Sequence, residues 1–326
     1  MIKKLQIERF KSIKSLSLDC RKVNLFIGEP DTGKTNILEA LSFLSHLGWG
    51  EPIGWYLRLT NNHGFDPLFY RQFFDQPITI GIDDVHVSIS IEGQDRRLRI
   101  QCEPNSGTGM VSFNHTLPNI PRLQSVRSYS YTSSLDWGYS AVGPDPDNIP
   151  FPPRGTNLMY LARHNSKVNE FLKENLAELD WKPRFDQNQK RFVLTENRGD
   201  EFFDYPIEML SDSLKRYFFY GAILVTSKDA VLVLDEPDVY AFPPYPKLLG
   251  EMIAGDETNQ FFLTTHNPYF LTGVVQKTPA ASLALFVCHR QPDGSTAAKQ
   301  LTTEEIQTVI EQGSSVFFNL DSFVSP

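Results

Sequence analysis

The sequence has few of the cysteines that stabilise a small secreted domain or build a zinc site. Only three cysteines occur in 326 residues, Cys20, Cys102 and Cys288, and no Cys-x-x-Cys pair is present. The adjacent His289 has no second pair of ligands near it in the sequence. The small, scattered set excludes a disulfide framework, and it predicts reduced thiols rather than a zinc site.

Long apolar runs and a general excess of positive charge are also missing. No stretch approaches the roughly 20 apolar residues of a membrane span, and charged residues interrupt the first ten positions where a signal peptide would be apolar. We therefore expect a cytoplasmic protein without a membrane partner. The net charge of −8 excludes a generally basic surface but leaves room for a local basic strip.

Residues 23–41 carry the most specific pattern in the chain. Val23–Ile27 is a short apolar run typical of a buried strand, and it leads into Gly28-x-x-x-x-Gly33-Lys34-Thr35. A helical pattern follows. This pattern predicts a phosphate-binding loop, because the strand and the helix that such a loop requires flank it. The alternative interpretation is an ordinary strand-to-helix turn.

The chemistry of this loop explains its residue types. The glycines let the backbone turn its N–H groups inward, and the helix N-terminus adds its positive end. Lys34 can then reach the β- and γ-phosphates, and the Thr35 hydroxyl can bind Mg²⁺. The residues expected to hold the nucleotide here are Gly28, Glu29, Pro30, Asp31, Thr32, Gly33, Lys34, Thr35 and Asn36.

Two further strands end in residues that suit this loop. The apolar run 230–234 ends in Asp235 and Glu236, which predicts a Mg²⁺ carboxylate followed by a general base. The alternative is a strand with an acidic turn. The run 260–265 ends at His266, where a γ-phosphate should lie, so a polarising role is favoured over a structural one.

Other candidate contacts are less specific. Ser211 precedes an apolar helix and is a good N-cap, although an exposed helix N-terminus also binds anions. Arg9 and Phe10 could lie against a nucleotide base, or they could be surface and packing residues. Gln72 could reach Mg²⁺ and the attacking water; Gln76 is an alternative, and so is a surface glutamine without this role.

The middle of the chain has mixed patterns. Period-two alternation over 78–100 predicts an antiparallel meander with turns at 83–84 and 92–95. Residues 103–156 are rich in Pro, Gly, Ser and Asn and predict loops with a short strand near 126–131. Thr156 is expected to cap a helix that runs to about Leu179, and 184–205 predicts a hairpin.

The order of these motifs resembles the ABC-type ATPase head. It is closest to SMC-like and RecF-like heads and to small stand-alone ATPases allied to the overcoming-lysogenization-defect family. The similarity covers about 1–45 and 205–275, through Ile7–Ser12, Asn36–Leu41 and Asp235–Asp238 followed by Phe242-Pro243. It implies an α/β P-loop NTPase fold with a mixed central sheet, an antiparallel β subdomain and a helical lobe.

The resemblance also implies roles for the candidate residues. ATP and Mg²⁺ would be held by the phosphate loop and Asp235, with Glu236 as general base and His266 as γ-phosphate sensor. Two heads would sandwich two nucleotides, and Ser211 would contact the γ-phosphate of the partner head. Two places depart from the family pattern. Ser213 occupies the signature glycine's position, where it would face the nucleotide, and Pro30-Asp31 replaces the common Asn-Gly pair.

One head spanning 1–326 is expected, with a nucleotide core from 1–45 and 205–326, a β subdomain at about 76–102 and a lobe at about 103–204. The leading function is a slow ATPase whose homodimer regulates a separate effector protein, in a defence or toxin-linked setting. A second hypothesis is a DNA-binding repair ATPase, because basic residues gather near the N-terminus and at 96–99. A third is a P-loop phosphotransferase.

Overall fold

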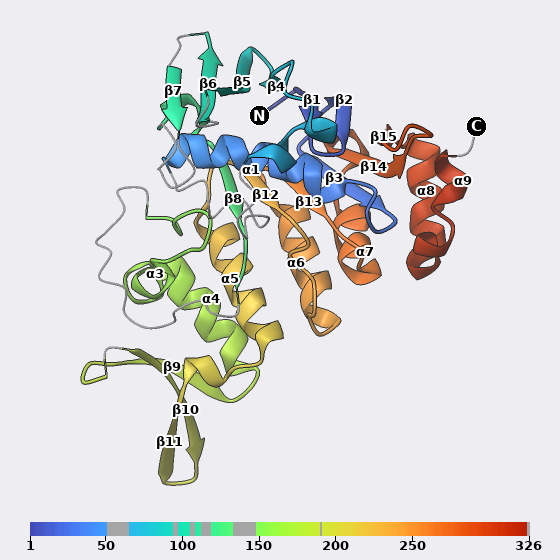
Figure 1. The fold of residues 1–326 in the computed structure, drawn as a ribbon. Helices are drawn as coiled ribbons and strands as arrows, with labels where there is room; N and C mark the ends of the chain where they lie inside the picture. The colour runs from blue at the N-terminus through green and yellow to red at the C-terminus, as the bar shows by residue number, and fades with distance from the viewer. Residues whose placement is uncertain are drawn as a thin grey trace.

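The computed structural model describes residues 1–50, 65–93, 97–104, 108–111, 119–132, 148–189 and 191–324. A six-stranded mixed sheet lies at its centre, in the order β15-β14-β3-β13-β12-β8 (Figure 1). Five strands are parallel and only β15, at one edge, is antiparallel. The strands are β3 (Val23–Gly28), β8 (Val126–Tyr129), β12 (Val231–Leu234), β13 (Gln260–Thr264), β14 (Leu283–Arg290) and β15 (Thr296–Gln300).

Helices and a second sheet cover the two faces of the central sheet. Helices α5, α6 and α7 lie on one face of the sheet, and α1 and the second sheet lie on the other (Figure 1). Leu25 and Leu263 belong to the core on the first face, whereas Phe26 and Phe262 belong to the core on the second. Burial on both faces explains why the central strands read as unbroken apolar runs. The helices are α1 (Lys34–Trp49), α5 (Asp212–Thr226), α6 (Pro244–Gly255) and α7 (Pro268–Lys277).

The second sheet is antiparallel, in the order β2-β1-β4-β5-β6-β7. It contains the meander predicted at 78–100, with the first turn at 83–84; residues 94–96 of the second turn lie outside the described residues. The sheet also includes β1 and β2, which the sequence analysis placed in the nucleotide core. Its strands are β1 (Lys4–Phe10), β2 (Ile13–Asp19), β4 (Ile78–Ile82), β5 (Val85–Glu92), β6 (Arg97–Glu103) and β7 (Thr108–Val111).

The single helix predicted from Thr156 to Leu179 is wrong. Two helices, α3 (Leu158–His164) and α4 (Ser166–Ala177), meet at Asn165, whose extended backbone ends the first and whose side chain caps the second. Asn157, not Thr156, is the N-cap position of α3. The predicted hairpin is present as part of a three-stranded meander that projects from the body (Figure 1). Its strands are β9 (Trp181–Asp186), β10 (Arg191–Arg198) and β11 (Glu201–Pro206).

The loop-rich stretch 103–156 is described only in part, and residues 105–107, 112–118 and 133–147 lie outside the described residues. The short strand predicted there is β8, which forms an edge of the central sheet. The chain ends in helices α8 (Thr303–Gln312) and α9 (Asp321–Val324) beside β14 (Figure 1). Short 3-10 helices are η1 (Asp66–Leu68), η2 (Tyr70–Gln72), η3 (Pro121–Leu123), η4 (Ile207–Met209), η5 (Ala280–Ser282) and η6 (Gly313–Phe318).

Candidate nucleotide site

The loop between β3 and α1 has the backbone that its glycines predict. Gly33 adopts a left-handed conformation with φ of 92° immediately before the first helical residue, Lys34. A Cβ atom on Gly33 would lie 2.0 Å from Thr296 Oγ1, and one on Gly28 would lie 2.5 Å from the Cys288 carbonyl oxygen. Both positions therefore require glycine for space, and Gly33 requires it for its φ angle as well.

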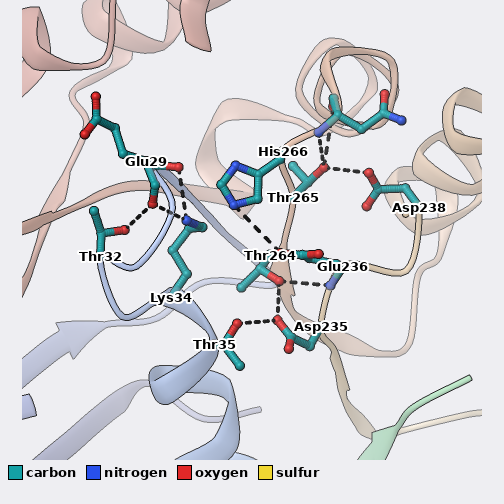
Figure 2. A network of polar contacts seen from close by, with 12 residues as sticks. Glu29, Thr32, Lys34, Thr35, Asp235, Glu236, Asp238, Thr264, Thr265 and His266 are labelled. Carbon is teal, nitrogen blue, oxygen red and sulfur yellow. Dashed lines mark hydrogen bonds and ion pairs between the residues drawn. The ribbon is translucent and has the colours of Figure 1, made fainter. Parts of the chain in front are cut away.

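Lys34 lies inside the loop that it follows. Its ammonium group donates hydrogen bonds to the carbonyl oxygens of Gly28 (3.0 Å) and Glu29 (2.7 Å), as Figure 2 shows for Glu29. The residue is only 4% exposed, and burial lowers the pKa of its ammonium group, opposed in part by Glu236 and Asp235. A buried cation at the end of this loop is what a phosphate group would contact.

The acidic residue after β12 meets the hydroxyl group at the start of α1. Thr35 Oγ1 donates a hydrogen bond of 3.3 Å to Asp235 Oδ1, across 200 residues of sequence (Figure 2). Thr264 Oγ1 donates to the same carboxylate oxygen at 2.6 Å. A hydroxyl and a carboxylate in contact form the oxygen donor set that Mg²⁺ prefers, so these side chains fit that ion.

Glu236 and His266 complete the same site. His266 Nε2 lies 3.7 Å from Glu236 Oε1 (Figure 2). Burial and the charge of Lys34 lower the pKa of His266, which favours the neutral imidazole. Glu236 has a φ of 45°, an uncommon left-handed conformation that costs about 1–3 kcal/mol for a residue with a side chain. Strain of this kind persists only where the surrounding structure holds the backbone in place.

A cavity of about 380 Å³ brings these residues together. Within the described part of the chain, Ser12, Pro30, Asp31, Gly33, Lys34, Thr35, Asn36, Glu236, His266 and Arg290 line it. Five separate parts of the sequence contribute lining residues: the β1–β2 turn, the phosphate loop, the segment after β12, the segment after β13, and the end of β14. The predicted convergence of the loop, the acidic pair and the histidine is therefore present in the geometry.

Several residues at the site were not predicted. Thr264 binds both Asp235 and the backbone N–H of Glu236, and Thr265 Oγ1 donates a 2.9 Å hydrogen bond to Asp238 Oδ2 (Figure 2). Asp238 is 3% exposed, and burial raises its pKa to about 7. The only sequence signal for the two threonines was their place at the end of a buried strand. Ser12 appeared in the sequence only as the last residue of the N-terminal motif, and Thr296 and Arg290 carried no signal.

The comparisons with known proteins agree with this geometry. The AAA ATPase domain family matches residues 1–228, which is more than half of the chain. The chain belongs to the AAA ATPase domain family. No curated protein matches it in sequence.

The fold of this AAA ATPase domain protein is that of an ABC-type ATPase head, as predicted. A solved structure of an Smc head bound to the C-winged helix domain of ScpA is 14% identical, with a TM-score of 0.52, and the match covers 93% of this chain and 99% of that chain. The SMC head domain from Thermotoga maritima gives 14% identity, a TM-score of 0.45 and coverage of 93% and 99%. A structure of the recombination mediator protein RecF is 13% identical, with a TM-score of 0.46, and the match covers 93% of this chain and 98% of that chain. The link to the overcoming-lysogenization-defect family stays a prediction.

Two predicted nucleotide contacts of the AAA ATPase domain concern the β1 strand. The base contact predicted for Phe10 is wrong, because its ring is fully buried in the core between α1 and the antiparallel sheet. Arg9 donates hydrogen bonds to the Pro77 carbonyl (2.7 Å) and to Glu8 (3.0 Å). A base contact by Arg9 stays a prediction and would require these bonds to be released.

Gln72 and the two serines stay predictions as well. Gln72 lines a second hollow together with Thr35 and Asn36, so it is on the side where Mg²⁺ would lie. Ser211 is the N-cap of α5 and accepts a hydrogen bond from the Leu214 N–H (3.3 Å). Ser213 accepts one from the Phe242 N–H (2.6 Å). Neither serine is among the described residues that line the cavity around Lys34.

Proposed function

We propose that this AAA ATPase domain protein binds Mg²⁺-ATP in the 380 Å³ cavity and hydrolyses it slowly to ADP and phosphate. The observation that carries the proposal is the contact between Thr35 and Asp235, because it joins the phosphate loop to the acidic pair. Lys34 lies on one side of this contact, and Glu236 and His266 line the same cavity. A nucleoside triphosphate held by Lys34 would place its terminal phosphate near Glu236 and His266.

Each residue has a defined part in the reaction. Lys34 would exchange its two carbonyl partners for phosphate oxygens, which are stronger acceptors. Glu236 would take a proton from the attacking water, and the hydrogen bond from its backbone N–H to Thr264 holds the backbone from which its side chain extends. His266, neutral and within 3.7 Å of Glu236, would donate a hydrogen bond to the γ-phosphate or orient the base.

The oxygen donors would hold the metal ion. Thr35 and Asp235 would hold Mg²⁺, with Gln72 available from the neighbouring hollow. When bound, Mg²⁺ would neutralise charge on the phosphate oxygens. Before that, Thr264 keeps Asp235 oriented, so the carboxylate needs little rearrangement to accept the ion.

We further propose that two copies close around nucleotide and that the closed dimer regulates a separate effector protein in the cytoplasm. Support comes from the segment after Glu236, where Tyr240 is 87% and Phe242 is 63% exposed. Tyr269, beside the same segment, is 52% exposed. Exposed aromatic side chains next to an active site are typical of a protein interface. A defence or toxin-linked setting rests on the resemblance of the sequence alone.

DNA binding has less support from the side chains. Lys11 pairs with Glu39, Lys14 lies 3.4 Å from Asp293, and Arg99 lies 2.6 Å from Glu92. Residue 96 lies outside the described residues. Because acidic partners neutralise part of these basic regions, we treat DNA binding as an outcome of the test below.

The test is ATP-dependent dimerisation of Glu236→Gln, measured by light scattering. Removing the base while keeping the shape of the side chain should trap ATP and the dimer, whereas Lys34→Ala should bind little ATP and stay monomeric. Phosphate release should be lost in both variants. A Glu236→Gln protein that is monomeric in saturating ATP and Mg²⁺ would rule out the dimer. Dimerisation that requires added DNA would favour the repair hypothesis.

A further inference from the structure

We propose that Arg290 is a second phosphate-binding cation of the nucleotide site, supplied by the β14–β15 hairpin. The inference rests on the proposed function, since it assigns another contact to the same nucleotide. Arg290 is the last residue of β14, and it lines the cavity that also contains Lys34, Thr35 and Glu236.

The backbone places Arg290 beside the phosphate loop. β14 runs parallel to β3, and Cys288 pairs with Gly28 at the point where the loop begins. From there the Arg290 side chain reaches the tip of the loop, where its Nε donates a 2.8 Å hydrogen bond to the Asp31 carbonyl. Neither terminal nitrogen of the guanidinium has a hydrogen-bond partner within the described residues. Two pairs of N–H donors are therefore available at the cavity.

The hairpin that carries Arg290 is firmly attached to the walls of the site. Thr296 on β15 donates its N–H to the Ser12 carbonyl (2.9 Å), and the hydroxyl groups of these two residues lie 2.6 Å apart. Asn36, on the first turn of α1, donates to the same Ser12 hydroxyl at 2.6 Å. The hairpin turn also accepts a hydrogen bond from Arg71, next to Gln72. A cation held on such a support loses little freedom when a ligand binds.

The excess of acidic side chains around the cavity favours a second cation for phosphate binding. Asp31 and Glu236 line the cavity, and Asp235 lies next to it, so the acidic groups outnumber Lys34 before any phosphate enters. Burial and the charge of Lys34 lower the pKa of His266, so these surroundings disfavour a positive charge on its imidazole. A triphosphate adds further negative charge. Arginine suits this place because its planar fork can donate two parallel hydrogen bonds to phosphate oxygens.

Arg290→Gln is the sharpest variant for the test. Glutamine can still donate to the Asp31 carbonyl, so it removes the charge and the fork while it can keep the support of the loop. The matched control is Lys14→Gln, which removes a cation that contacts Asp293 in the same hairpin turn but does not line the cavity. Lys34→Ala reports separately on whether this cavity is the nucleotide site at all.

The measurement is the Kd for ATP and for ADP by calorimetry at several salt concentrations. Arg290→Gln should raise the Kd about tenfold, as expected for a lost charge-assisted hydrogen bond, and binding should depend less on salt. Lys14→Gln should stay within about twofold of the parent protein. An unchanged Kd in Arg290→Gln, with binding lost in Lys34→Ala, would overturn this inference alone. An unchanged Kd in Lys34→Ala would overturn the proposed function as well.

A second measurement does not depend on the folding of a variant. Phenylglyoxal modifies exposed arginine side chains, and mass spectrometry locates the modified residues. ATP should protect Arg290 and leave Arg198, 63% exposed on the projecting meander, as reactive as before. Modification of Arg290 at the same rate with and without ATP, in protein that calorimetry shows to be saturated, would also overturn the inference.

Discussion

The hydroxyl of Thr264 donates a 2.6 Å hydrogen bond to Oδ1 of Asp235 and accepts one of 2.9 Å from the backbone N–H of Glu236. One fully buried side chain from β13 therefore orients both acidic residues that follow β12. The relationship explains how two acidic residues that are adjacent in sequence, the proposed metal ligand Asp235 and the proposed general base Glu236, can serve different parts of one site. It also connects the two central strands at the edge where the cavity lies.

Replacement of Thr264 by valine should separate orientation from binding. Valine has nearly the same shape but leaves Asp235 and the Glu236 N–H without their shared partner. We expect kcat to fall at least about tenfold, because misplacement of a catalytic group is costly, while the Kd for ATP changes less. Steady-state kinetics and calorimetry measure both quantities. Thr264→Ser, which retains the hydroxyl, should keep most of the activity; equal losses in the two variants would contradict the role.

Gly33→Ala should disrupt the phosphate loop more than a positive φ angle alone would. Its Cβ would lie 2.0 Å from Thr296 Oγ1 and 2.8 Å from Ser12 Oγ, in addition to the strain at φ of 92°. The matched control is Gly294→Ala, where φ is 80° and nothing lies within 4 Å of the new atom. Denaturant unfolding should show a loss of about 1–2 kcal/mol for Gly294→Ala and about 1–3 kcal/mol more for Gly33→Ala. Only Gly33→Ala should lose ATP binding; similar stability in both would disprove the clash.

The sequence predicted the parts of the site that local patterns encode. The phosphate loop, the acidic pair and His266 each follow a buried strand, and parallel strands bring their carboxyl ends to one edge. The sequence did not reveal which sheet β1 would join, because alternation fits either sheet. Because β1 joins the antiparallel sheet, Phe10 is buried in the core and is not exposed to a nucleotide base. Arg290 was missed because the end of a distant strand carries no motif.

The break between α3 and α4 was missed for a related reason. The apolar spacing continues across both helices, whereas the cap that separates them depends on a single residue. Asn165 Oδ1 accepts hydrogen bonds from the N–H groups of Lys167 (3.0 Å) and Val168 (3.3 Å). Its Nδ2 also donates to the Asn148 carbonyl at 3.2 Å, so the side chain joins α4 to the preceding segment.

Asn165→Ala should therefore destabilise the helical lobe. Loss of an N-cap costs about 0.5–2 kcal/mol, and we expect the upper half of that range because the residue is only 9% exposed. Urea unfolding measures the change, and Asn165→Asp should recover part of it by keeping the acceptor. The comparison is Thr156→Ala, which replaces the residue predicted to be the cap and should change stability by less than about 0.5 kcal/mol. An Asn165→Ala protein as stable as the parent would contradict the capping role of Asn165.

Asp238 should make the stability of the protein fall as pH rises. Burial raises its pKa from 3.8 to about 7 in the folded protein, so between these values the folded state holds a proton that the unfolded state has released. The folded state is therefore favoured below about pH 4, and this advantage is lost progressively up to about pH 7. The total change is up to about 4 kcal/mol. Oδ1 of Asp238 has no hydrogen-bond partner within the described residues, which adds to the cost of ionisation.

Asp238→Asn isolates this effect, because asparagine is neutral at every pH and can still accept the hydrogen bond from Thr265. The difference in unfolding free energy between variant and parent should grow in favour of the variant from pH 5 to pH 8. The other titratable groups are present in both proteins, so their contribution drops out of the difference. Urea unfolding at four pH values provides the measurement. A difference that does not vary with pH would show that Asp238 is ionised in the folded protein throughout this range.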